Sequence, residues 1–207
     1  MSMTRIPFER PPGDVDPRRE PPRFYYPLAT IKCVGTPVFR SQAARDFACL
    51  LDVNPDVASW TCEGADLFFE DDAYTVDFVA TKTDGTTYLY DVADTRPEPP
   101  EWVELAAYQK GRIYGSMSME DFTDSIRLLN SKDLLRYGFH RCPLGDRVHI
   151  LAALDEMGSL TVAEALSAFR EGRPMACLAA LILQGFLEIE MDEALIGPET
   201  VVRRIRD

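Results

Sequence analysis

The sequence predicts a mixed α/β protein in two parts, an α/β layer with one open sheet edge followed by a winged helix-turn-helix. In the first half, a helical pattern precedes two alternating runs around an Asp-Gly turn, and a second helix follows them. In the second half, three helical segments precede two short strand patterns. The change of pattern places the boundary between Asn130 and Arg147, and we divide the chain into 1–27, 28–130 and 131–207.

The elements of the first half can be predicted in order. Residues 1–27 hold seven prolines and five arginines, which predicts an extended arm. From Ser41, a fair N-cap, apolar residues recur at helical spacing. Strand patterns and then helices follow; they are Val57–Trp60, Ala65–Glu70, Tyr74–Lys82, Thr86–Val92, a helix from Pro99-Pro100 through Lys110, and a helix over 119–129 that Ser118 and Asp121 would cap.

The second half reads as three helices and a wing. Arg147–Met157 is the first helix, and Thr161 with Glu164 forms a capping box that opens the second. Pro174 opens the third helix, which runs through Gln184 and is closed by Gly185. Strand-like alternation over 186–192 and 201–205 completes a winged helix-turn-helix, with a two-stranded wing.

Composition and cysteine usage are those of an ordinary globular protein. Of the 207 residues 46% are hydrophobic, and no apolar run approaches the roughly 20 residues needed to cross a bilayer. The start of the chain shows no signal-peptide pattern, and the five cysteines contain no CxxC pair. We therefore expect reduced thiols, a cytoplasmic location and no membrane contact. The spacing of His140, Cys142 and His149 fits no zinc pattern.

The net charge restricts how this chain could bind DNA. Acidic residues number 34 and basic residues 22, which gives a formal charge of −12. Proteins that grip duplex DNA over a long face do so by neutralising phosphates with Lys and Arg. DNA affinity here must come from local patches, a divalent metal or a partner that holds the DNA. The charge argues against a free-standing DNA-binding regulator, although it does not exclude a nuclease.

Two aspartates flank the Asp84-Gly85 turn and form the candidate site. Asp77 and Asp91 are separated by 13 residues, with the turn almost midway, so they should lie near each other at one end of two antiparallel strands. Two carboxylates on one face can hold Mg²⁺. Ala93 shares the face of Asp91 by alternation, whereas Asp94 points away. A lysine at position 93 would assist phosphodiester cleavage, and alanine cannot.

Several segments, taken in order, carry a resemblance to a known family; they are SQAARDFACLLDVNPDV, YTVDF, YLYDVA, LLNSKDLLRYG, TVAEALSAF and LQGFLEIEMDEALIGPETVV. Together they resemble the TnsA family of transposon-end endonucleases, over about residues 36–205. The resemblance implies a restriction-endonuclease-like PD-(D/E)xK domain followed by a winged-helix domain. It also implies action within a heteromeric transposase, in DNA transposition and recombination.

The family's catalytic residues are matched only in part. The family aspartate matches Asp77, with Val76 in place of the preceding proline, and the acid of the acid-x-lysine motif matches Asp91. Ala44 stands where the family's first helix carries a glutamate, and Ala93 stands where it carries the lysine. The resemblance thus implies two retained carboxylates beside two lost functional groups.

These losses predict weak or absent magnesium binding and impaired cleavage. Asp77 and Asp91 remain as metal ligands, and two carboxylates alone hold hydrated Mg²⁺ loosely. Without the lysine, developing negative charge lacks a cation worth several kcal/mol of the barrier. Lys110, on the following helix, is the candidate to replace it; the alternative is that Lys110 is an exposed, solvated side chain. The candidate catalytic residues are therefore Asp77, Asp91 and Lys110.

The third helix of the second half is unsuited to reading DNA. Its sequence, PMACLAALILQG, has no basic residue, whereas recognition helices present Arg, Lys, Asn or Gln to base edges. Such a helix is either buried core or a surface that docks a protein. In the TnsA family the C-terminal domain contacts an ATP-dependent (AAA+) transposition regulator, so the resemblance implies that partner here.

Three hypotheses follow. The first is a TnsA-like component of a transposition complex, an interaction scaffold whose nuclease domain is catalytically impaired and whose partners are a transposase, an AAA+ regulator and the DNA they hold. The second is an active Mg²⁺-dependent DNA endonuclease with a rearranged site. The third and weakest is a winged-helix transcription regulator.

Overall fold

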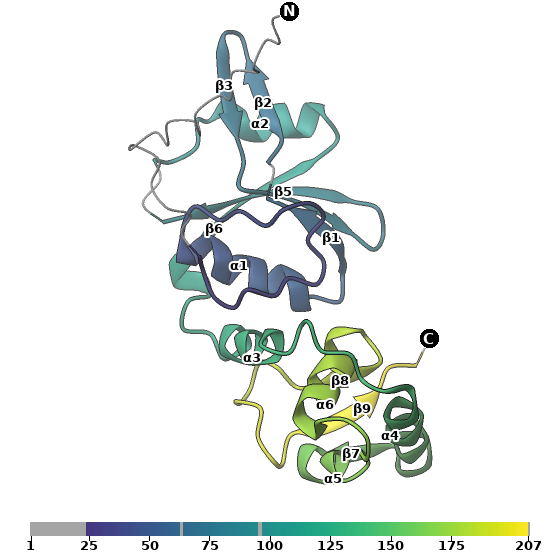
Figure 1. The fold of residues 1–207 in the computed structure, drawn as a ribbon. Coiled ribbons are helices and arrows are strands. Elements are labelled where there is room, and N and C mark those ends of the chain that lie inside the picture. Colours follow the sequence, from purple (N-terminus) through teal and green to yellow (C-terminus); the bar gives the residue numbers. More distant parts are fainter. Residues whose placement is uncertain (1–23, 63, 95–96, 207) are drawn as a thin grey trace, which may run out of the picture.

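A computed structural model shows the fold and describes residues 24–62, 64–94 and 97–206 (Figure 1). The elements of its first part are α1 (Gln42–Val53), β1 (Val57–Thr61), β2 (Asp66–Phe69), β3 (Asp72–Thr75), β4 (Phe78–Lys82), β5 (Thr87–Ala93), α2 (Trp102–Gln109), β6 (Ile113–Ser118), a 3₁₀ turn η1 (Met119–Asp121) and α3 (Ile126–Leu135). The second part holds α4 (Leu144–Met157), β7 (Ser159–Thr161), α5 (Val162–Leu166), α6 (Pro174–Leu183), β8 (Leu187–Ile189) and β9 (Val201–Arg204).

A four-stranded mixed sheet organises the first part. Its strand order is β1-β4-β5-β6, with β6 parallel to β5 and the other pairs antiparallel. The strands β2 and β3 form a separate hairpin. The predicted mixed α/β architecture is confirmed, and so is the turn between β4 and β5, where Gly85 adopts a φ of +88°. That left-handed conformation is one that glycine reaches without steric cost.

Helix α1 covers one face of this sheet. The Ser41 hydroxyl accepts a hydrogen bond from the Ala44 N–H at 3.1 Å, which confirms the predicted N-cap. Beneath the helix lies an aromatic core in which rings from α1, from the strands and from the segments before α1 and α3 contact one another; they are Phe39, Phe47, Trp60, Phe78, Tyr90 and Phe122. Aromatic side chains bury much apolar area each, so this cluster dominates the packing of α1.

The opposite face of the sheet is covered by α2 and the β2–β3 hairpin (Figure 1). Val103, Ala106 and Ala107 of α2 are buried against Leu67 of β2 and Leu89 of β5. The predicted helix after Pro99-Pro100 is confirmed. The sheet is therefore sandwiched between two apolar clusters, one on each face.

Two expectations about local structure were wrong, and one strand of the first part was not predicted. Tyr74–Lys82 is not one strand, because Val76 and Asp77 separate β3 from β4. The helix expected over 119–129 is instead a short 3₁₀ turn capped by Ser118, and α3 begins at Ile126. The hydroxyl of Ser125 accepts the Leu128 N–H at 3.2 Å and is the N-cap of α3. Strand β6 was not predicted at all, because parallel pairing with β5 is a long-range contact.

Two buried charged residues of α1 hold the segment that precedes it. Arg45 donates to the carbonyls of Pro27 and Ala29, at 2.8 and 2.7 Å. Asp52 accepts the backbone N–H groups of residues 31–32, at 3.1 and 3.0 Å. Both side chains are fully buried, and their hydrogen bonds offset only part of the cost of removing two charges from water, since burial still raises the pKa of Asp52. The predicted arm over 1–27 lies mostly outside the described residues.

The second part has its own hydrophobic core, formed by α4, α5, α6 and a three-stranded sheet of order β7-β9-β8. The three predicted helices are confirmed, and the capping box of Thr161 and Glu164 is formed in full. Strand β7 was not predicted, so the small sheet has three strands instead of two. Residues 176–181 of α6 are all buried, so most of this helix is core.

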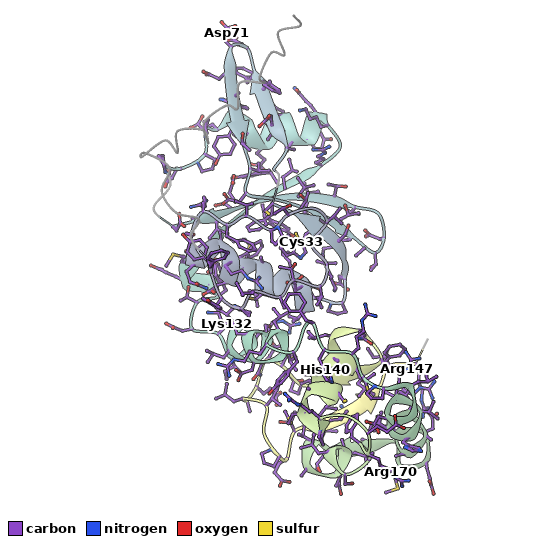
Figure 2. All side chains as sticks on the ribbon, viewed as in Figure 1. Cys33, Asp71, Lys132, His140, Arg147 and Arg170 are labelled. Carbon is purple, nitrogen blue, oxygen red and sulfur yellow. The ribbon has the colours of Figure 1, made fainter. Side chains whose placement is uncertain are left out.

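Helix α3 joins the two parts. Its Leu128 and Leu135 belong to the first core, while the helix also contacts α6 of the second part. Lys132 of α3, labelled in Figure 2, pairs with Asp46 of α1 at 2.8 Å. The division at residue 130 proposed from sequence falls inside this continuous helix, and the second core begins with α4. No helix among the described residues is long and apolar enough to cross a membrane.

Candidate functional site

The two predicted aspartates meet at one end of β4 and β5. Asp77 lies in the break directly before β4, and extending the register from Phe78 and Tyr90 places it opposite Asp91 of β5. The Asp77 N–H donates to Asp91 Oδ1 at 2.9 Å, and the Val92 N–H donates to Asp77 Oδ2 at 2.9 Å. The Asp91 carboxylate therefore accepts the N–H of Asp77 itself, and the Asp77 carboxylate accepts the N–H of the residue that follows Asp91. These two hydrogen bonds join the start of β4 to the end of β5.

Asp91 is held on the α2 face of the sheet. Its side chain is 2% exposed, and the Tyr114 hydroxyl of β6 donates to Asp91 Oδ2 at 2.8 Å. Leu89, two residues earlier, packs in the α2-side cluster, which agrees with strand alternation. The carboxylate thus lies in a protein interior that supplies donors to both of its oxygens.

Arg40, which the sequence analysis did not single out, is central to the cluster. Its Nε and Nη2 donate to Asp77 Oδ1 and Oδ2 at 2.7 and 2.8 Å, a bidentate pair. The same guanidinium also contacts the Asp94 carboxylate and the Val92 carbonyl. The hydrogen bond to Asp77, followed by that to Asp94, raises the pKa of Arg40 above its usual value despite partial burial. An arginine of the protein itself therefore supplies a cation to this site.

Asp94 joins the cluster from the other side of the strand. It was expected to point away from the face of Asp91 and Ala93, and it does so: it extends toward the start of α1, on the opposite face of the sheet. There the Ser41 hydroxyl donates to Asp94 Oδ2 at 2.6 Å, while Arg40 binds the other oxygen. The N-cap of α1 is thereby tied to the ends of β4 and β5. The sequence signal was an Arg-Ser pair immediately before a helix, which by itself is too common to mark a site.

The two alanines lie in different surroundings. Ala44 is 1% exposed and belongs to the α1-side core with Phe78 and Val92. Successive strand residues point to opposite faces, so Ala44 lies across the sheet from the Asp91 side chain. Ala93 is exposed at the end of β5. The side chain of a glutamate at position 44 would therefore extend from the α1 side of the sheet, opposite the side on which the Asp91 carboxylate lies.

Lys110 makes its described contacts with β2. Its Nζ donates to the Asp66 carbonyl at 3.0 Å and lies 5.7 Å from the centroid of the Phe68 ring. Among the described contacts the structure brings Asp77, Asp91, Asp94 and Arg40 together, but it does not bring Lys110 to them.

The donor set around the aspartates does not fit a magnesium ion. Mg²⁺ requires near-octahedral oxygen coordination and keeps several waters. Here both Asp77 oxygens accept from a guanidinium, and the Asp91 oxygens accept an N–H and a hydroxyl. Within the described part of the chain, no three His, Cys, Asp or Glu side chains are grouped so that they could hold a metal.

Three of the five cysteines are poorly suited to nucleophilic chemistry. All five are free, and burial raises the pKa of Cys33, Cys49 and Cys142 to about 12. A thiol with so high a pKa is a poor nucleophile and a poor metal ligand at neutral pH. His140, labelled in Figure 2, forms a hydrogen bond between its Nε2 and the buried Cys177 Sγ, 3.5 Å away at the edge of the second core.

The fold and cluster define a mixed α/β protein with a carboxylate–arginine cluster where β4 begins and β5 ends. Comparison with known protein families finds no family that matches the chain, and comparison with curated proteins finds no matching relative.

Proposed function

We propose that this chain is a TnsA-like component of a DNA transposition complex, whose nuclease-type domain does not cleave DNA and serves as a scaffold for a transposase and an AAA+ regulator. The observation that carries the proposal is the arginine in the carboxylate cluster. Arg40 binds both oxygens of Asp77 and also binds Asp94. An internal cation therefore already pairs with the carboxylates that a divalent ion would need as ligands.

The arrangement of the elements supports the proposal. A mixed sheet covered by α1 on one face and α2 on the other precedes a body of three helices and a small antiparallel sheet. This is consistent with a restriction-endonuclease-like PD-(D/E)xK domain followed by a winged-helix domain. The proposed transposition complex and its partner proteins are based on the resemblance of residues 36–205 to the TnsA family.

The chemistry supports a scaffold over an enzyme. Cleaving a phosphodiester requires a positioned nucleophile and cations at the developing charge. Ala93 supplies no cation, and Lys110 is engaged with β2. Arg40 is itself neutralised by two carboxylates, so its charge is already balanced within the protein. The same contacts hold the strand ends together, which is a structural role.

A nicking assay tests the loss of cleavage. Supercoiled plasmid is incubated with the protein and Mg²⁺ or Mn²⁺, beside a known metal-dependent nuclease in the same buffer. The assay is repeated with the proposed partners, a transposase and an AAA+ ATPase, because endonucleases of the TnsA family act in a complex. We expect no nicking in either case, and Asp91→Ala should behave as the unmodified protein does. Metal-dependent nicking that Asp91→Ala and Lys110→Ala abolish would instead establish an active enzyme.

A binding experiment tests the scaffold role. The purified chain is mixed with the proposed partners, a transposase and an AAA+ ATPase, and complexes are separated by size-exclusion chromatography with mass determination. We expect a complex with at least one of them, and we expect transposition reconstituted from these proteins to require this chain. Transposition at an unchanged rate without the chain would contradict the proposal.

A further inference from the structure

Strand β6 lies at one edge of the four-stranded sheet. Among the described residues it pairs with β5 alone, through six consecutive register positions from Ile113 to Ser118. A strand paired on one side presents a row of backbone N–H and C=O groups on the other. Those groups can accept another strand.

The strand itself lacks the charged residues, prolines and bulges by which many proteins block such pairing. Ile113–Ser118 contains no charged residue and no proline, and its register with β5 shows no bulge. Ser116 is exposed near its middle, and Ile113 and Met119, near its two ends, are 47% and 36% exposed. The edge is therefore uncharged and regular in a chain whose net charge is −12.

The charges beside the strand differ at its two ends. Lys110 and Arg112 precede it, and Glu120 and Asp121 follow it. When two copies of one strand pair antiparallel about a two-fold axis, the start of each lies opposite the end of the other. The basic end of each copy then meets the acidic end of its partner. Parallel pairing would instead set like charges side by side.

We propose that a second copy of this chain binds along β6, antiparallel and about a two-fold axis near Gly115 and Ser116. The dimer joins two four-stranded sheets into one continuous sheet of eight strands. Main-chain hydrogen bonds supply the affinity, and the opposed charges fix the antiparallel direction. The proposal does not depend on the proposed function, since it rests on the edge strand and its flanking charges.

Sedimentation velocity over a concentration series tests the dimer. Ser116→Lys places like charges together at the two-fold axis, and Ser159→Lys is the matched control, an exposed serine on the edge strand β7 of the other sheet. We expect the unmodified protein and Ser159→Lys to dimerise alike. Ser116→Lys should raise the dimer dissociation constant at least about tenfold. A monomer at every concentration, or equal weakening by both variants, would overturn the proposal.

A charge exchange tests the direction of pairing. Arg112→Glu should weaken the dimer, because each contact with the acidic end occurs twice about the axis. The double variant Arg112→Glu with Glu120→Arg restores opposite charges across the axis and should recover most of the lost affinity. Circular dichroism confirms that each variant is folded. A double variant that dimerises no better than Arg112→Glu alone would overturn the antiparallel arrangement.

Discussion

At the scale of single residues, Arg40 joins the start of α1 to the ends of the central strands. It lies in the chain immediately before the N-cap of α1 and contacts the carboxylates of Asp77 and Asp94, which belong to the two strand ends. Arginine suits this position because its planar group forms two parallel hydrogen bonds with one carboxylate while a third nitrogen remains for another. A lysine could not reproduce that geometry.

We predict that Arg40→Ala destabilises the fold by roughly 2 kcal/mol, because hydrogen bonds to charged groups at a partly buried site are lost together. Urea unfolding measures the change. Arg136→Ala is the matched control; it removes an exposed Arg136–Asp133 pair and should change the free energy of unfolding by less than about 0.5 kcal/mol. Equal effects of the two variants would show that the cluster contributes nothing special to stability.

At the scale of elements, the start of α4 anchors the loop between α5 and α6. Asp146 is fully buried, and its carboxylate accepts the backbone N–H groups of residues 170–172, at distances from 2.7 to 3.2 Å. Although burial opposes ionisation, these hydrogen bonds lower the pKa of Asp146 below its ordinary value of 3.8. One carboxylate therefore holds the turn that leads into α6.

The lowered pKa gives a prediction with a definite sign. A carboxyl whose folded pKa is depressed contributes stability above its unfolded pKa, and the contribution is lost as pH falls through the folded pKa. Asp146→Asn should thus destabilise the second part at neutral pH, and the difference from the unmodified protein should shrink below pH 3.8. Urea unfolding over a pH series measures this, with Asp155→Asn as an exposed control on the same helix. A difference independent of pH would contradict the assignment.

At the scale of the whole molecule, Asn130 of α3 connects the two parts. Its side chain is 1% exposed; it donates to the carbonyls of Met191 and Ala194 and accepts the Ile196 N–H, all within 3.0 Å. A buried amide that satisfies three backbone groups of one loop fixes the position of that loop. The second part is thereby held against a helix of the first core.

We predict that Asn130→Ala loosens this connection, at a cost of about 2–4 kcal/mol, because three buried backbone groups lose their partner. Hydrogen exchange should quicken over residues 191–196 while the core of α1 keeps its protection. Arg127→Ala is the matched control, since it breaks an exposed pair with Asp192 between the same two segments and should change little. Unchanged exchange in Asn130→Ala would contradict the role given to this amide.

Much of the local structure could be predicted from the sequence, because it depends on residues a few positions apart. Ser41 predicts the start of α1, Thr161 with Glu164 predicts α5, and Asp84-Gly85 predicts the hairpin that brings Asp77 toward Asp91. Caps and tight turns satisfy backbone groups that neighbouring side chains can reach.

Only the tertiary structure decided the rest, because the deciding contacts span long stretches of chain. The sequence by itself determined two aspartates near one hairpin and the absence of a lysine at position 93. It could not show that Arg40, 37 residues before Asp77, pairs with that aspartate, or that Asp94 joins them. Strand β6 depends in the same way on a parallel partner, β5. Pairing between distant segments is set by how the two faces of the sheet bury their apolar residues, and no local pattern encodes it.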